Sequence, residues 1–569
     1  MEQIFGGKPL VYACLACGIG LAANTDTLYA ADWVISPSIG IQQIYTDNAN
    51  LTHEDEVSDN ITVVRPTLSI YKEGARANLD FNYAPEYRHY WDETEDNEVV
   101  HFMRTEGNVE IAENHLYLDG WLRADRTNIT STGRSGIGGL TGTEDDTDFY
   151  SVGLSPYFTA RLGDFSVVEV RFTGDRIDYS EDLDNDSTGK RGEIAFGNGS
   201  MFTNQIWEVL YQQSDVDYEN LDDDNETKIF RAELIQKITN QWSAAFSAGY
   251  EEYDLAVADD RDDSTWSIGA IYTPNPRTRF ALGVGERSFG DDYYFDFSHR
   301  TGRTIWTASY EQDFVSARDE LSTQPLFERQ DAFGNLIRDP ILESSPVTVR
   351  AAYSPSITED FYESKRFSTE FTYQTTRTSV NLRGRYLERL YDRSGRDTED
   401  IELSVLLTRR LARLTSGYFQ ITGIDHEEEV LVYDQLTATL GVSYQFGTDS
   451  RVGFDITHLE RDADTDVDSL RGESRESQCH LSVLGPVNTN PIRPVVSEKA
   501  PIKAYPKGTS FGAHPKGTSF GAHPAGLGLF FRPAALAFAH VESLHIAHAA
   551  LLDEKIVPSR ADWVSVNRP

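Results

Sequence analysis

The chain has little cysteine and no long apolar run, and its 51 basic residues are far fewer than its 91 acidic ones. Its three cysteines are Cys14, Cys17 and Cys479, so residues 31–469 contain none. This excludes a thiol nucleophile and a cysteine-based metal site from that region. No apolar run long enough for a membrane-spanning helix follows the N-terminal region,. The net charge of −40, concentrated in residues 31–469, argues against nucleic acid and anionic lipid as partners,.

Residues 1–30 have the features of a secretory signal peptide. Leu10–Ala23 is apolar and small, and the Ala30–Ala31 pair offers a cleavage point,. We therefore predict export through the periplasm. A lipoprotein modified at Cys14 or Cys17 and a short buried helix are the alternatives.

Strand-like alternation dominates the rest of the chain. In residues 431–460, apolar and polar side chains alternate on both sides of a short turn at Gly447–Ser450. A period of two gives one apolar and one polar face. The same pattern recurs in Ala75–Arg88, Arg279–Arg287 and Ser379–Tyr386. Strands of about ten residues joined by tight turns are typical of a transmembrane barrel, with lipid outside and water inside.

The connections predict the number of strands. Ten short turns alternate with eleven longer, mostly acidic loops, which implies twenty-two strands. We predict an all-β fold, a transmembrane antiparallel up-and-down β-barrel of about 22 strands (range 18–22), over residues 31–469. Short turns then lie in the periplasm, with both termini. The longest loop, Asp313–Glu359, can fold inward as a constriction. A soluble β-sheet is disfavoured, because opposed charges follow one face over many long strands.

Charged residues on the polar faces are candidates to line the lumen. Two interpretations stay open: these side chains line a pore and set its selectivity, or they pair with one another and fill space. The candidates are Arg76, Asp80, Glu86, Arg88, Arg279, Arg287, Arg383 and Arg385.

One acidic segment partly matches a calcium-binding loop. Asp182, Asp184, Asp186 and Glu193 occupy the first, third, fifth and twelfth positions of an EF-hand loop, but Ser187 stands where glycine is needed,. No helices are predicted beside it, so a solvated acidic loop is preferred. No catalytic motif is found. We expect no metal, no cofactor and no enzymatic activity.

Three segments resemble a known family. They are DWVISPSIGIQQIYTDNANL, DAFGNLIRDPI and FYESKRFSTEFTYQTTRTSVNL. On these residues, the chain resembles the outer-membrane β-barrel proteins associated with exopolysaccharide loci and the PEP-CTERM sorting system of proteobacteria, over residues 31–469. The resemblance implies a role in export of polysaccharide or associated proteins. It carries over no catalytic residue.

The expected function is therefore an outer-membrane channel or scaffold that assists exopolysaccharide export. A general or solute-specific porin and a structural or adhesive barrel without transport are the alternatives. Expected partners are outer-membrane lipid and lipopolysaccharide, the barrel-assembly machinery, polysaccharide and export-system proteins. We expect a monomer.

Residues 470–569 differ from the rest. Alternation stops, and the nonapeptide PKGTSFGAH occurs twice in succession. We predict an aberrant or disordered, irregular tail, explained by a frameshift that removes the last strand. A genuine periplasmic extension and a fusion are the alternatives. Without a last strand, the first and twenty-first strands have unpaired edges, and unsatisfied backbone groups in lipid cost several kcal/mol each.

Overall fold

A computed structural model describes residues 33–52, 56–130, 140, 146–180, 185–221, 223–258, 260–323, 357–428, 431–446, 450–465 and 472–484. The predicted signal peptide, residues 1–30, lies outside these ranges. The described residues form one 22-stranded sheet and one short helix. The elements are β1 (Trp33–Thr46), β2 (Asp59–Lys72), β3 (Ala77–Tyr90), β4 (Glu98–Ala112), β5 (Leu116–Asn128), β6 (Asp146–Leu162), β7 (Ser166–Tyr179), β8 (Ser187–Asn198), β9 (Gln205–Tyr218), β10 (Asn225–Lys237), β11 (Trp242–Asp254), β12 (Arg261–Asn275), β13 (Thr278–Arg287), β14 (Gly290–Arg300), β15 (Thr304–Ser316), α2 (Ala317–Thr323), β16 (Phe361–Gln374), β17 (Thr378–Tyr391), β18 (Asp397–Arg410), β19 (Thr415–Glu428), β20 (Leu431–Phe446), β21 (Ser450–Thr465) and β22 (Gly472–Leu484).

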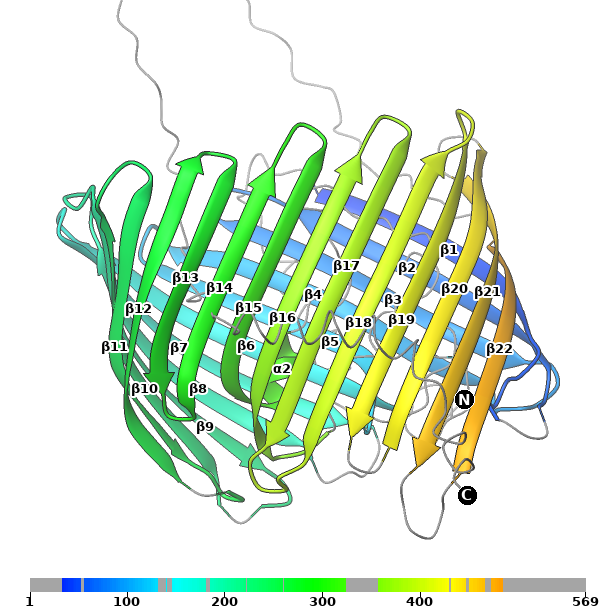
Figure 1. Cartoon of the computed structure of the whole chain (residues 1–569), viewed down its shortest axis with the longest axis horizontal. Coiled ribbons are helices and arrows are strands. Elements are labelled where there is room, and N and C mark those ends of the chain that lie inside the picture. Colours follow the sequence, from blue (N-terminus) through cyan, green and yellow to red (C-terminus); the bar gives the residue numbers. More distant parts are fainter. Residues whose placement is uncertain are drawn as a thin grey trace, which may run out of the picture.

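The strands form a closed up-and-down barrel (Figure 1). Each strand pairs antiparallel with the next in sequence, and β22 also pairs with β1. This confirms the predicted fold class. Connections from odd to even strands meet at one end, which we call the long-loop end, and connections from even to odd strands meet at the short-turn end. In bacterial barrels, short turns are periplasmic and long loops are extracellular.

The outer face of the barrel is apolar. Large apolar side chains at alternate strand positions are exposed, with Phe172 and Leu440 each at 62%. Such exposure in water is rare, and a lipid-facing belt accounts for it. Among the described residues, no helix has the length and apolarity needed to cross a membrane. The chain is an outer-membrane β-barrel.

The prediction that strands end at residue 469 is wrong. β22 lies within the expected irregular tail and pairs with β21 from Gly472↔Thr465 to Leu484↔Gly453. Its sequence lacks the alternation on which the prediction relied. A ladder uses backbone groups that nearly every residue supplies, so a segment without that pattern can still complete it. Residues 485–569 lie outside the described part. The frameshift stays a prediction, but the missing last strand, which was the main reason for it, is present as β22.

The seam between the first and last strands is paired over only part of its length. β22 pairs with Gln42–Thr46 of β1, and Leu484 lies opposite Gln42. Within the described residues, Trp33–Ile41 pairs with β2 alone. Pro486 follows Leu484 by two residues, and proline cannot donate to a ladder. The closure of the barrel therefore depends on the pairing of β22 at the long-loop end.

Two truncations test this closure. A chain ending after Leu484 keeps β22 and should fold, whereas a chain ending after Thr465 should not, because β1 and β21 would present unpaired edges to lipid. Folding into lipid vesicles is measured by heat-modifiable migration in gel electrophoresis and by protease resistance. Equal folding of both chains would contradict the role given to β22.

Candidate functional site

The helix α2 lies inside the barrel (Figure 1). It begins where β15 ends at the long-loop end. Ser316 caps it: the Asp319 backbone N–H donates to Ser316 Oγ at 3.2 Å, and the Ser316 hydroxyl donates to Asp319 Oδ2 at 2.9 Å. A serine that caps a helix and contacts an acid three residues later fixes where the helix starts. The cap therefore turns the chain sharply from the wall into the lumen.

One side of α2 is attached to β7 and β8. The Arg318 guanidinium donates to the Asp175 carboxylate and, through Nε, to Ser187 Oγ at 2.9 Å. The arginine is only 5% exposed. Gly189 makes room for it, since a Cβ there would lie 2.7 Å from Arg318 Nη2. This wall therefore has a recess and a carboxylate for a cationic side chain.

The other side of α2 is attached to β16 and β17. Glu320 accepts hydrogen bonds at both carboxylate oxygens. Arg366 Nη2 donates to Oε1 at 3.0 Å and Arg389 Nη2 donates to Oε1 at 3.4 Å, while the Tyr362 hydroxyl donates to Oε2. We call Tyr362, Arg366 and Arg389 the carboxylate cradle. Hydrogen bonds to an ionised group are stronger than neutral ones, so this attachment is firm.

These two attachments make α2 a bridge across the lumen. Residues two positions apart on a helix project about 200° apart, so Arg318 and Glu320 point to opposite sides. β7 and β8 are separated from β16 and β17 by many strands in either direction around the barrel. The charges are complementary on both sides: a cation meets Asp175, and an anion meets the cradle.

The predicted loop Asp313–Glu359 is shorter than expected at its start, because β15 continues to Ser316. Its described parts fold inward. At the far end of this loop, the Ile357 backbone N–H donates to the Ile129 carbonyl at 2.8 Å, and the Ile357 side chain packs on Phe149, Ile177 and Tyr179. Residues 324–356 lie outside the described part of the chain. Both ends of the loop thus contact the β5–β8 wall.

Other long-loop residues also pack onto the inner wall at this end of the barrel. They come from the connections that follow β1, β5 and β11, and each is nearly or fully buried. They are Leu51 on Leu459, Leu140 among Ile44, Ile61, Val63 and Tyr90, and Leu255 with Tyr253, Phe314 and Phe361. Together with α2, these contacts place loop residues against the inner wall at the long-loop end.

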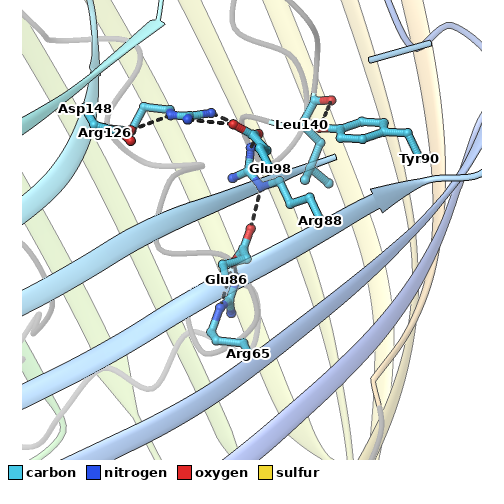
Figure 2. A network of polar contacts seen from close by, with 8 residues as sticks. All are labelled: Arg65, Glu86, Arg88, Tyr90, Glu98, Arg126, Leu140 and Asp148. Atoms are coloured by element: carbon cyan, nitrogen blue, oxygen red, sulfur yellow. Dashed lines mark hydrogen bonds and ion pairs between the residues drawn. The ribbon is translucent and has the colours of Figure 1, made fainter. Parts of the chain in front are cut away.

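The inner wall of β2 to β6 carries a continuous ion-pair network (Figure 2). Glu86 accepts from both Arg65 and Arg88, and Glu98 accepts from both Arg88 and Arg126. The last ion pair of the network joins β5 to β6, where Arg126 Nε donates to Asp148 Oδ1 at 2.8 Å. Glu86 and Arg88 are each 1% exposed. Buried charges need such partners, because an unpaired one carries the full desolvation cost.

Most other lumen candidates are also paired. Arg279 pairs with Asp296, and Arg287 pairs with Glu251 and Asp313 at 3.0 Å each. Asn82 donates to Asp80 at 3.0 Å. These contacts favour the pairing interpretation for those positions. A role in selectivity stays a prediction.

The remaining arginine candidates lie in two different places, the middle of β17 and a short turn. Arg383 and Arg385 lie on the inward face of β17, opposite Glu370 and Ser368 of β16. Arg76 instead precedes β3 in a short turn and pairs with Glu113 at 2.9 Å. Its side chain is 51% exposed, so Arg76 belongs to the short-turn end and lies apart from α2.

The described residues of the EF-hand-like pattern do not lie together in the structure. Asp182 and Asp184 lie outside them. Asp186 precedes β8 and accepts from the Tyr179 backbone N–H at 2.7 Å, whereas Glu193 lies within β8 opposite Arg171. The six steps of strand from Ser187 to Glu193 span about 20 Å. Asp186 and Glu193 therefore cannot share one ion. Among the described residues, no group of His, Cys, Asp and Glu is arranged to hold a metal.

Sequence reasoning missed the bridge and its cradle. The serine-to-aspartate spacing of Ser316 and Asp319 could have indicated a helix start inside the longest loop. Arg366 and Arg389 stand at inward positions of alternating strands. Nothing in the sequence, however, says that their partner comes from a loop rather than from a neighbouring strand.

No family model matches the chain, and no curated protein matches it. Among solved structures, it is similar to the FrpB iron transporter from Neisseria meningitidis, at 8% identity and a TM-score of 0.47, covering 80% of this chain and 81% of that chain. It is also similar to the Ferric-Catecholate import receptor Fiu from E. coli K12, at 9% identity and a TM-score of 0.45, covering 81% and 82%. The siderophore receptor PirA from Pseudomonas aeruginosa matches at 9% identity and a TM-score of 0.41, covering 79% and 80%. At these identities and TM-scores, the likeness carries no argument about function.

The ion-pair network can be tested through stability. In Glu86→Ala, Arg65 and Arg88 lose the carboxylate between them, and removing one partner of a buried ion pair costs about 3–5 kcal/mol. The free energy of unfolding is measured in urea with lipid vesicles. Arg76→Ala, which removes an exposed pair, should cost less than about 1 kcal/mol. Equal losses in the two variants would show that the network does not stabilise the barrel.

Glu320 also predicts a response of the bridge to acid. Burial alone would raise the pKa of Glu320, but the charges of Arg389 and Arg366 and the hydrogen bond from Tyr362 outweigh it and hold the pKa below its ordinary value. The bridge is therefore fully stabilised above the ordinary pKa of glutamate and is lost as pH falls through the lowered value. Single-channel conductance should rise in that acidic range. Glu320→Gln should lack this rise and Glu113→Gln, in an exposed turn, should keep it. If the conductance of Glu320→Gln still rises at acidic pH, other carboxylates cause the rise.

Proposed function

We propose that the protein is an outer-membrane channel whose passage is limited by the α2 bridge. The observation that carries this proposal is the attachment of α2 to opposite walls through Arg318 and Glu320. A barrel of this strand number encloses a wide interior. A structural barrel without transport needs only paired strands, and it has no need of a charged helix that divides the lumen.

The inner wall supports passage of a polar cargo. Its inward positions carry ion pairs and hydrogen-bonded hydroxyls, such as Ser309 with Ser368 at 2.9 Å and Thr439 with Thr457 at 3.0 Å. Such a wall can exchange hydrogen bonds with a hydrated solute at little cost. Apolar cargo would find no continuous apolar surface among these groups.

For the cargo, we propose exopolysaccharide, as the family resemblance implies. A single extended polysaccharide chain is hydrated and narrow, which suits a polar lumen with a constriction. The rival cargo is a small solute taken up as by a porin, and the inward packing of several long loops at the mouth favours it. We retain exopolysaccharide as the cargo, because a hydrated, narrow chain suits the polar inner wall.

Conductance tests the channel. The double variant Arg318→Ala, Glu320→Ala removes both attachments of α2, so its single-channel conductance in planar bilayers should exceed that of the wild type several-fold. Glu113→Gln should match the wild type. If neither the wild type nor the double variant conducts, the barrel is a scaffold and the channel proposal is wrong.

The cargo is tested in a deletion strain. Loss of surface polysaccharide, restored by the wild-type gene, supports export. Loss of growth on one nutrient with normal surface polysaccharide would overturn export in favour of uptake.

A further inference from the structure

We propose that the carboxylate cradle of Tyr362, Arg366 and Arg389 is a binding site for the carboxylate of an acidic sugar, and that Glu320 occupies it as an internal substitute. The inference rests on the proposed function and names its substrate class: a polysaccharide that carries uronic acid units. Glu320 belongs to α2, whereas all three donors belong to the barrel wall. The wall therefore presents a complete carboxylate site to whatever fills that part of the lumen.

The geometry fits a carboxylate rather than a neutral group. Three donors converge on one group, two of them are cationic, and both of its oxygens are engaged. Arginine is suited to this recognition because its guanidinium is planar, always charged and rich in donors. A neutral sugar hydroxyl would not replace the negative charge that the two guanidinium groups share, and would leave Asp400 beside Arg389 and Glu311 beside Arg366 as their acidic neighbours,.

The wall holds the cradle in place independently of α2. Arg389 is fully buried and donates to Asp400 Oδ2 at 3.3 Å, and Asp400 Oδ1 lies 2.7 Å from Nδ1 of the buried His426. Tyr362 packs against Tyr391, with ring centroids 4.9 Å apart. Arg366 also donates to Glu311 at 3.3 Å. Because these partners come from β15 to β19, the donors stay ordered when Glu320 leaves.

Further arginines lie near the cradle, each opposite an acid. Arg383 and Arg385 lie on the inward face of β17, with Glu370 of β16 opposite Arg383 and Glu402 of β18 opposite Arg385. When Glu320 leaves, this wall loses one negative charge beside the two arginines of the cradle. An anionic group of the cargo is attracted to that place, since the potential of a low-dielectric site follows its local charges.

Exchange of carboxylates would couple binding to opening. Removing Glu320 alone leaves buried guanidinium groups undercompensated, which is costly. A carboxylate from the cargo removes that cost as it enters, so it favours the state in which α2 has left the β16–β17 wall. A ligand shifts such an equilibrium only through its preference for one state, and the shared cradle supplies that preference.

Binding of D-glucuronate tests the inference. Calorimetry is carried out on the full-length barrel refolded in detergent, with D-glucose and acetate as further probes. Glu320→Ala vacates the cradle, so its affinity for glucuronate should rise at least tenfold over the wild type, with no gain for glucose. The second variant, Glu320→Ala with Arg366→Gln, should lose most of this gain. Glu113→Gln, which removes one exposed carboxylate in a short turn away from the cradle, should bind as the wild type does. Heat-modifiable migration verifies that each variant folds.

Three outcomes would overturn the inference: no gain for glucuronate in Glu320→Ala, an equal gain for glucose, or a gain that persists without Arg366. A gain for acetate equal to that for glucuronate would show a general carboxylate site and would overturn the assignment to acidic sugars. Failure of the site and failure of the channel are distinguishable, because binding is measured without transport. A gain in affinity for glucuronate in a barrel that does not conduct would support the carboxylate site and overturn the channel proposal.

Discussion

In the hydrocarbon of a membrane, a backbone N–H or C=O without a partner costs several kcal/mol, and the pairing of strands in this protein meets that constraint over most of the barrel. Each strand pairs with the next, and the ladder returns from β22 to Gln42–Thr46 of β1. Closure also explains why β22 forms in a segment with no alternating pattern. Two neighbouring strands, β21 and β1, already present the backbone groups that it completes.

A closed barrel of so many strands is wide and has a polar inner face. The charged side chains on that face therefore need partners. The charged inner side chains are held in networks, as Arg65, Glu86 and Arg88 show. The long loops then occupy the mouth, with α2 reaching opposite walls. The inner charges of β2 to β6 are paired between strands, whereas Asp175 of β7 and the arginines of β16 and β17 find partners on α2.

The bridge is held by charge on both sides, and this has functional consequences. Apolar packing gains from any apolar surface, whereas an ion pair can be replaced only by another ion of the same sign. Arg318 and Glu320 therefore make the position of α2 sensitive to acid and to anions. The arginines of β16 and β17 would give a passing anionic chain a place to exchange with Glu320. The proposed channel and the proposed carboxylate site both depend on the position of α2.

By itself, the sequence determined the barrel, its strand order and which residues face outward or inward. A period of two is a local property, so Leu440 was correctly placed toward lipid and Glu86 and Arg88 toward the lumen. It did not reveal β22, because that segment lacks the alternating pattern and one of its two partner strands, β1, lies far away in sequence. Nor did it reveal the bridge. Glu320 meets Arg389 across 69 residues of chain, and Arg318 meets Asp175 across 143. Only the closed ring brings these charges together, since alternation says which face a side chain occupies and not what lies opposite it.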